Sequence, residues 1–132
     1  MVISLTSFPA RLPYIGPCLA SLVSQLEPED RIVLWLGKEQ FPDGVADQPE
    51  VVRVFFQEFG GRVEVRYTED IRSFTKLVPA LMAFPNETIV TFDDDIIYPV
   101  DCIKRLVNTH KKFPNCLVCE RGQTVCYDSG GE

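Results

Sequence analysis

The sequence predicts an α/β fold built on a mostly parallel sheet with helices on both faces. Three apolar runs rich in β-branched residues, at positions 2–5, 32–36 and 89–92, are typical of strands buried on both faces of such a sheet. Segments with helical periodicity separate these runs, and strands that alternate with helices indicate βαβ units. The chain has 132 residues, so we expect one domain that covers positions 1–132.

Two further strands are expected. Over residues 63–67, apolar side chains alternate with Glu64 and Arg66. Alternation leaves one face of a strand in water, so this strand is expected at the edge of the sheet. Leu117 and Val118 are expected to form a fifth strand.

Apolar residues three and four positions apart predict the first two helices. One covers residues 15–26 and is expected to begin near Pro17, because proline is tolerated in the first turn of a helix. The other covers residues 51–59, and Gly60 and Gly61 supply the expected stop at its C-terminal end.

The same spacing predicts two more helices closer to the C-terminus. One, over residues 77–84, is expected to begin or kink at Pro79. The last covers residues 99–113, with Pro99 at its first position, Asp101 in its first turn and lysines in its last turn.

Composition and charge exclude several classes of protein. With 45% hydrophobic and 24% charged residues, the chain is neither disordered nor of low complexity. Its net charge of −6 repels polyanions, so no nucleic-acid partner is expected. No apolar stretch approaches the roughly 20 residues that cross a bilayer. We expect a cytoplasmic protein with no transmembrane segment or signal peptide. The chain has five cysteines, an odd number, and we expect them to be reduced thiols.

The strongest chemical signal is a buried strand that ends in three acids, Asp93, Asp94 and Asp95, followed by a helix that starts at a proline. In open α/β sheets, ligands gather at the carboxyl ends of strands. Adjacent carboxylates repel one another unless a cation offsets their charge, and Mn²⁺ or Mg²⁺ takes oxygen ligands while leaving positions for phosphate oxygens. The alternative is that these acids cap the next helix and form a solvated turn.

This acidic cluster resembles the DXD motif of GT-A-fold glycosyltransferases, with Asp93 and Asp95 as the outer acids, and the order of segments resembles family 2. The likeness extends from the opening strand and residues 7–11 through residues 72–76 to the acids. It implies a GT-A, Rossmann-like fold and a metal-dependent enzyme of the hexosyltransferase type. Such an enzyme moves a sugar from a UDP- or GDP-sugar to an unknown glycan, lipid or protein acceptor.

The resemblance also implies roles for single residues. Asp93 and Asp95 would hold Mn²⁺ or Mg²⁺. The residues expected to bind the nucleotide-sugar are Thr6, Ser7, Phe8, Arg11, Arg72, Lys76, Asp93 and Asp94. The acid that contacts the nucleobase in family 2 is missing after the second strand, and Asp70 is a candidate to replace it. Only 132 − 95 = 37 residues follow Asp95, so the resemblance implies a truncated chain that lacks the acceptor-binding half, and no catalytic base is assigned.

Two alternative functions stay open. The first is a catalytically inactive GT-A-like module that binds nucleotide or another protein. The second is a phosphatase of the haloacid dehalogenase type, which also uses a strand that ends in D-x-D, although Ile97 stands where that class has Thr or Val. A nucleotidyltransferase is disfavoured because residues 7–11 contain no glycine.

Three other features have plainer interpretations. Trp35 is expected in the core, because it lies within a strand, and His110 on the apolar side of the last helix. A zinc site could in principle be formed by the side chains of His110, Cys116, Cys119 and Cys126. If residues 116–119 form a strand, however, side chains three apart point to opposite faces. Buried thiols are therefore the simpler hypothesis.

Overall fold

The protein is described by a computed structural model that covers residues 1–47 and 50–122, and it forms two compact units. The first unit is Met1–Val100, and the second begins at Asp101. The strands of the first unit are β1 (Val2–Ser7), β2 (Arg31–Gly37), β3 (Val63–Thr68) and β4 (Ile89–Thr91). Its α-helices are α1 (Gly16–Val23), α2 (Glu50–Glu58) and α3 (Val78–Ala83), and the second unit contains α4 (Cys102–Lys112).

The four strands form one parallel sheet in the order β3-β2-β1-β4. The chain moves outward from β1 through β2 to β3, and then returns across the sheet to place β4 on the other side of β1. The prediction of an α/β fold with a parallel sheet is therefore confirmed, as is the position of β3 at an edge. The reversal makes the gap between β1 and β4 a topological switch point, where open α/β sheets bind ligands.

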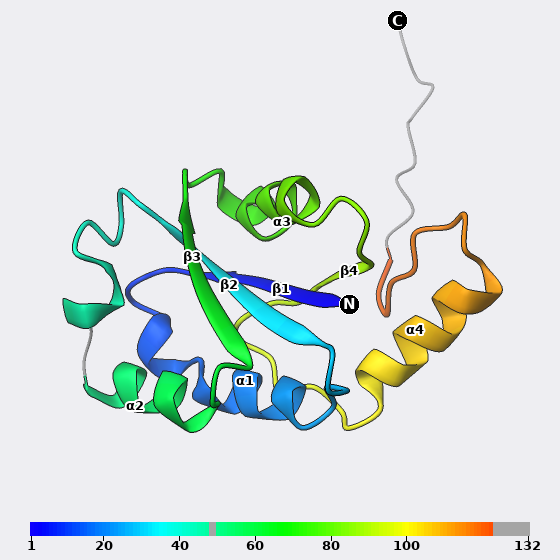
Figure 1. Ribbon diagram of the computed structural model, residues 1–132, viewed down its shortest axis with the longest axis horizontal. Helices are drawn as coiled ribbons and strands as arrows, with labels where there is room; N and C mark the ends of the chain where they lie inside the picture. The colour runs from blue at the N-terminus through cyan, green and yellow to red at the C-terminus, as the bar shows by residue number, and fades with distance from the viewer. Residues whose placement is uncertain (48–49, 123–132) are drawn as a thin grey trace, which may run out of the picture. The chain divides into compact units, whose positions relative to one another are not determined.

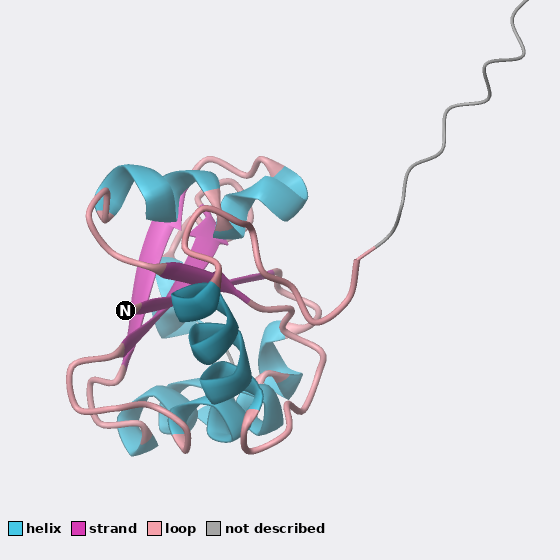
Figure 2. Ribbon diagram, turned by 90° about the vertical axis from the view of Figure 1, so that its right-hand side faces the viewer, coloured by secondary structure: helices cyan, strands magenta, loops and turns pink. Residues whose placement is uncertain are grey.

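Helices cover both faces of this sheet (Figures 1 and 2). Helices α1 and α2 lie on one face and α3 on the other. Connections between parallel strands are right-handed, so a change in the direction of strand order moves the connecting helix to the opposite face. The short 3₁₀ helix η3 (Arg72–Lys76) leads into α3.

The core follows the two-residue period of the strands. On one face, Val2 of β1 and Val33 and Trp35 of β2 pack with Ala80 of α3. On the other face, alternate residues of β1 and β2 are fully buried: Ile3, Leu5, Ile32, Leu34 and Leu36. Trp35 lies in the core, as predicted.

A buried hydroxyl group connects the sheet to η3. The Ser4 hydroxyl accepts a hydrogen bond from Nε1 of Trp35 at 3.0 Å and donates one to the main-chain carbonyl of Lys76. Buried polar groups need such partners, because losing water without replacing its hydrogen bonds is costly. Ser4 therefore fixes the main chain of Lys76 from inside the protein.

Helix boundaries lie within one residue of the expected ones, except at the C-terminal end of α1 and at the start of α4. Helix α1 begins at Gly16, one residue before Pro17, but ends at Val23, three residues earlier than expected. Helix α2 ends at Glu58, two residues before Gly60. The φ angles of Gly60 and Gly61 are +55° and +78°. Such angles suit glycine at the end of a helix.

Three expectations were wrong. Leu117 and Val118 form no strand, because no neighbouring strand pairs with them, and Leu117 is fully exposed. Strand β4 is an edge strand and is only partly buried, although the sequence predicted a strand covered on both faces. The last helix begins at Cys102, with Asp101 as its N-cap, so Pro99 lies before the helix.

No helix among the described residues has the length and apolar character needed to cross a membrane.

Replacing Ser4 with alanine is expected to lower the free energy of unfolding by about 1–3 kcal/mol, because the indole N–H of Trp35 loses its buried partner. Urea unfolding followed by Trp35 fluorescence measures this change. Ser24→Ala is the matched control: the Ser24 hydroxyl is exposed, so its loss should cost less than about 0.5 kcal/mol. Equal stability of the two variants would contradict the structural role of Ser4.

Candidate functional site

A cleft of about 380 Å³ opens at the carboxyl ends of the strands; we call it the first cleft. It lies within the first unit and contains all eight residues expected to bind a nucleotide-sugar: Thr6, Ser7, Phe8, Arg11, Arg72, Lys76, Asp93 and Asp94. Pro9, Gln40, Asp70 and Ser73 complete its walls. Its volume falls in the range of roughly 300–1,000 Å³ that is usual for small-molecule sites.

The topology of the sheet explains why distant segments meet in this cleft. Each wall follows the carboxyl end of one strand: Phe8 follows β1, Gln40 follows β2, Asp70 follows β3 and Asp93 follows β4. In a parallel sheet these ends share one edge. The order β3-β2-β1-β4 then brings the loops after β1 and β4 together at the switch point.

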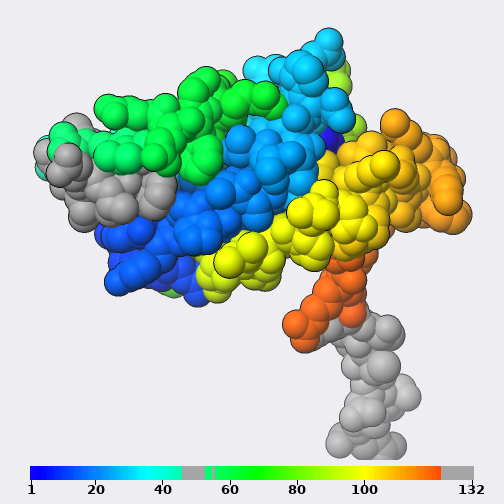
Figure 3. Space-filling view, turned by 90° about the horizontal axis from the view of Figure 1, so that it is seen from below, coloured from blue at the N-terminus to red at the C-terminus, as the bar shows by residue number. Residues whose placement is uncertain are grey.

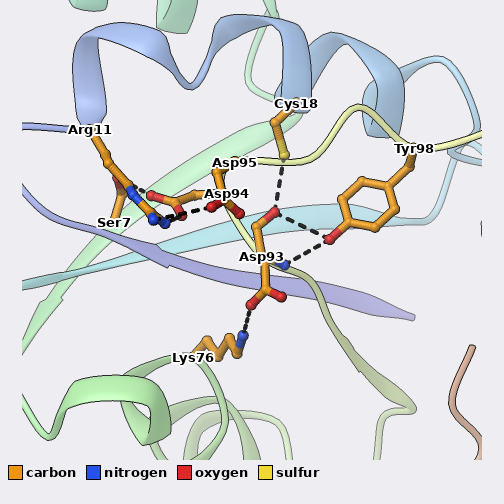
Figure 4. A network of polar contacts seen from close by, with 8 residues as sticks. All are labelled: Ser7, Arg11, Cys18, Lys76, Asp93, Asp94, Asp95 and Tyr98. Carbon is orange, nitrogen blue, oxygen red and sulfur yellow. Dashed lines mark hydrogen bonds and ion pairs between the residues drawn. The ribbon is translucent and has the colours of Figure 1, made fainter. Parts of the chain in front are cut away.

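Asp94 is the buried centre of the acidic cluster, with 8% of its surface exposed. Its Oδ2 accepts a hydrogen bond from the Ser7 hydroxyl at 2.6 Å, and its Oδ1 accepts one from Nη1 of Arg11 at 2.8 Å (Figure 4). Both carboxylate oxygens of Asp94 thus accept hydrogen bonds from side chains at the end of β1 or in the loop after it. This carboxylate joins the end of β1 to the loop after β4.

Arg11 bridges two of the three acids. While Nη1 contacts Asp94, Nη2 lies 3.1 Å from Oδ2 of Asp95. The hydrogen bond and charge of Asp94 raise the pKa of Arg11 above its usual value. The guanidinium also lies over the ring of Phe8, 5.3 Å from its centre, in a cation–π contact. Arg11 is therefore held in place on several sides.

Asp93 is positioned through its main chain and its side chain separately. Its N–H donates to the hydroxyl of Tyr98 at 2.9 Å, and the ring of Tyr98 meets Phe92 edge to face with centroids 4.5 Å apart. The Asp93 carboxylate forms an ion pair with Nζ of Lys76. Tyr98 and Phe92 thus brace the turn that presents this acid.

The outer acids turn in different directions (Figure 4). Asp93 points toward Lys76, whereas Asp95 points toward Arg11 and lies outside the first cleft. Among the described residues, no three His, Cys, Asp or Glu side chains are grouped as metal ligands. Oδ2 of Asp93 and Oδ1 of Asp95 nevertheless have no hydrogen-bond or ion-pair partner in the described chain. Such oxygens fit Mg²⁺ or Mn²⁺, which often binds one or two carboxylates and takes its other ligands from water and phosphate.

Asp70 organises the opposite wall of the cleft. Its Oδ2 accepts from Nε2 of Gln40 at 2.6 Å and its Oδ1 from the N–H of Arg72 at 2.8 Å. A Cβ at Gly37 would lie 2.9 Å from Cβ of Asp70, so glycine at the end of β2 gives this loop room to approach. Both oxygens of Asp70 have protein partners, and its expected contact with a nucleobase stays a prediction.

Arg72 is the strained residue of the site. Its φ of +59° is the only positive value outside glycine in the described chain, in a region that costs L-residues roughly 1–2 kcal/mol. Arg72 lines the first cleft, and its side chain has no carboxylate partner among the described residues. By contrast, Arg11 and Lys76 are both paired with acids. Arg72 is therefore the cation most available to an anionic ligand.

Some residues of the site were not predicted. Pro9, Gln40 and Ser73 line the first cleft, and their signal in the sequence was their position just after predicted strands or beside predicted site residues. Tyr98 was also missed, because its role depends on a turn of the chain that brings its hydroxyl back to Asp93.

The hypothetical zinc site is only partly described. Cys126 lies outside the described residues. Cys116 and Cys119 are exposed and lie in an irregular segment, so the objection based on strand geometry does not apply. The hypothesis of buried thiols is wrong for these two cysteines, whereas Cys18 and Cys102 are buried.

No protein-family model matches this chain, and no curated protein matches its sequence.

Cys18 is expected to resist alkylation in the folded protein. Burial, together with the charge of Asp94, raises the pKa of this thiol from 9.0 to about 12, so it stays protonated where an ordinary thiol ionises. In iodoacetamide labelling at pH 8 followed by peptide mass spectrometry, Cys116 and Cys119 should react and Cys18 should react only after unfolding in urea. Equal labelling of Cys18 and Cys116 in the native protein would contradict this description.

Replacing Arg72 with glycine should not destabilise the fold. Glycine removes the cost of about 1–2 kcal/mol of the left-handed backbone but adds about 0.4–1 kcal/mol of unfolded-state entropy. We therefore expect a free energy of unfolding between unchanged and about 1.6 kcal/mol higher. Arg72→Ala is the control, because it removes the same side chain and keeps the strain. Urea unfolding compares the two, and a glycine variant less stable than the alanine variant would disprove the strain.

Proposed function

We propose that this protein binds a nucleoside diphosphate sugar in the first cleft and transfers the sugar to an acceptor, as a metal-dependent glycosyltransferase with a GT-A-like domain. One observation carries the proposal: the eight residues predicted for this role come from three distant segments of the chain and line one cleft at the switch point of a parallel sheet. A shared cleft is what a common ligand requires.

The charges of the first cleft suit a diphosphate accompanied by a cation. Its walls carry three cationic side chains, Arg11, Arg72 and Lys76, and three acids, Asp70, Asp93 and Asp94. A diphosphate alone would add negative charge to a balanced site in a protein of net charge −6. A divalent cation that enters with it offsets most of that charge.

The ion pair between Lys76 and Asp93 can open at little cost. The Asp93 side chain is 58% exposed, and exposed ion pairs contribute only about 0–1 kcal/mol. In the proposed complex, Lys76 and Arg72 turn to phosphate oxygens, while Asp93 is released toward the cation. Asp94 keeps both protein partners and stays in place as the fixed part of the cluster.

The remaining residues suit the nucleoside. Phe8 offers an aromatic face beside Thr6 and Ser7 at the end of β1, and Asp70 with Gln40 offers hydrogen-bonding groups on the opposite wall. Aromatic faces stack on nucleobases with little regard to sequence, so the polar pair would carry any preference for one base.

In the transfer step, an acceptor hydroxyl oxygen forms a bond to the anomeric carbon of the donor sugar. The bond from that carbon to the diphosphate oxygen breaks, its electron pair stays on the diphosphate, and the hydroxyl proton leaves to solvent. Mn²⁺ or Mg²⁺ would be held by Asp93, together with Asp95 if that side chain turned from Arg11 toward the first cleft. The ion would act as a Lewis acid that stabilises the departing diphosphate. Arg72 and Lys76 would bind the same negative charge and keep the leaving group in position.

Isothermal titration calorimetry with UDP and GDP, each with and without MnCl₂, tests the proposal. We expect one nucleotide to bind and Mn²⁺ to strengthen its binding. Asp93→Asn and Asp95→Asn should each weaken the Mn²⁺-dependent binding by about tenfold or more, since that loss corresponds to about 1.4 kcal/mol.

Asp43→Asn is the control, because Asp43 is exposed and does not line the first cleft. Binding of a nucleotide that is indifferent to Mn²⁺ and to both aspartate changes would remove the metal from the proposal. If neither UDP nor GDP binds, the module that interacts with another protein becomes the better hypothesis.

A further inference from the structure

Helix α3 consists only of apolar residues, and so do the residues directly beside it. Positions 77–84 contain no polar or charged side chain. A helix at the surface of a globular protein normally has polar residues on its outer side, whereas a helix that is apolar all round is buried in a core or in a membrane. Because α3 packs on the sheet with only one of its sides, its composition does not match its place in the fold.

The inner side of α3 fixes the helix to the sheet. Ala80 is fully buried against side chains of β1 and β2, and Phe84 packs against the same cluster. Phe84 also lies under two guanidinium groups, those of Arg31 and Arg66. These contacts explain why the residues on the inner side are apolar, but they do not explain the outer side.

The outer side of α3 is open to solvent together with the preceding η3. We call the four residues Phe74, Val78, Leu81 and Met82 the apolar ridge. Phe74 is 64% exposed, Leu81 50% and Met82 77%. Val78, Leu81 and Met82 are three and four positions apart, so they share one side of the helix. Large apolar side chains exposed together mark a surface that contacts another protein or a membrane.

The other face of the sheet has a different cover. Figure 3 shows that face, on which α1 and α2 lie next to each other. The exposed residues of α2 include Arg53, Gln57 and Glu58, as expected for a helix that faces water. An apolar outer side therefore distinguishes α3 from the helix α2 on the opposite face.

A protein partner fits the apolar ridge poorly. Stable protein interfaces involve roughly 20–30 residues a side and about one hydrogen bond per 100–200 Å². The ridge has far fewer residues, and none of its side chains carries an N–H or O–H donor or an oxygen acceptor. The acyl chains of lipids also lack such groups, so the chemistry of the ridge matches lipid better than protein.

We infer that the apolar ridge inserts into a phospholipid bilayer at the boundary between headgroups and acyl chains, and that the protein binds a membrane surface through α3. Positions 77–84 are far fewer than the roughly 20 residues that span a bilayer, so α3 would lie in the plane of the surface. No acid occurs at positions 71–86, so no carboxylate of this segment has to leave water on insertion.

This inference does not rest on the proposed function. None of the four ridge residues lines the first cleft, and no nucleotide or metal takes part in the contact. A failure to bind vesicles would leave the nucleotide experiment untouched, and the reverse also holds.

Sedimentation of the full chain with phosphatidylcholine vesicles tests the inference. The unmodified protein should sediment with the vesicles to the same extent at low and at high NaCl concentration, because the ridge carries no charge. Met82→Asp should weaken the partition by at least about tenfold, since a carboxylate has to leave water. Circular dichroism checks that this variant is folded, as expected for a residue that is mostly exposed.

Tyr14→Asp is the matched control, because Tyr14 is 78% exposed and lies directly before α1, on the opposite face of the sheet. It should partition like the unmodified chain. A second readout uses Met82→Trp, whose indole should emit at shorter wavelength when vesicles are added. The native Trp35 is buried and is expected to report no change.

Three outcomes would overturn the inference. The first is no sedimentation with vesicles, together with an unchanged emission of Met82→Trp. The second is an equal partition of Met82→Asp and Tyr14→Asp. The third is a dimer in analytical ultracentrifugation without lipid that Met82→Asp abolishes, which would assign the ridge to a second copy of the chain instead.

Discussion

The buried carboxylate of Asp94 is the constraint on which the rest of the site depends. A carboxylate with so little exposure is tolerated only where its charge and its lone pairs are matched. Ser7 at the end of β1 and Arg11 in the loop after it provide that match, while Asp94 itself follows β4. The same two bonds therefore connect the chain segments that meet at the switch point of the sheet and fix the guanidinium of Arg11.

This arrangement leaves the carboxylates of the two neighbouring acids exposed. Because Asp94 takes the hydroxyl and one edge of the guanidinium, Asp93 and Asp95 are left on either side with exposed carboxylates. Three consecutive acids thus have three different environments. The middle residue supports the structure, and the outer two are the ones able to meet ligands.

Much of this could be predicted from the sequence because it depends on local pattern. Buried runs gave β1 and β2, alternation gave β3 at an edge, and the position of the acids after a strand put them at the correct end of the sheet. The eight residues that line the first cleft were predicted through the resemblance to GT-A-fold glycosyltransferases. Strand order could not be predicted from local pattern. The apolar composition of β4 is typical of a central strand, but β4 lies at an edge of the sheet because it pairs only with β1.

Other features depend on contacts between residues far apart in the chain. No sequence pattern shows that Asp95 turns toward Arg11 while Asp93 turns toward Lys76. The start of α4 was misplaced for a similar reason, because a proline near a helix indicates where one can begin, while the backbone at Asp101 decides where it does.

The hydroxyl of Ser4 has a consequence for how variants of this protein should be interpreted. This hydroxyl lies in the sheet and donates to the main-chain carbonyl of Lys76, whose ammonium group pairs with Asp93 in the first cleft. Damage deep inside the fold can thus present itself as a defect in ligand affinity, with no change in any group that touches the ligand. A genetic screen for lost binding would accordingly recover interior positions alongside those of the cleft, and stability measurements would be needed to separate the two kinds.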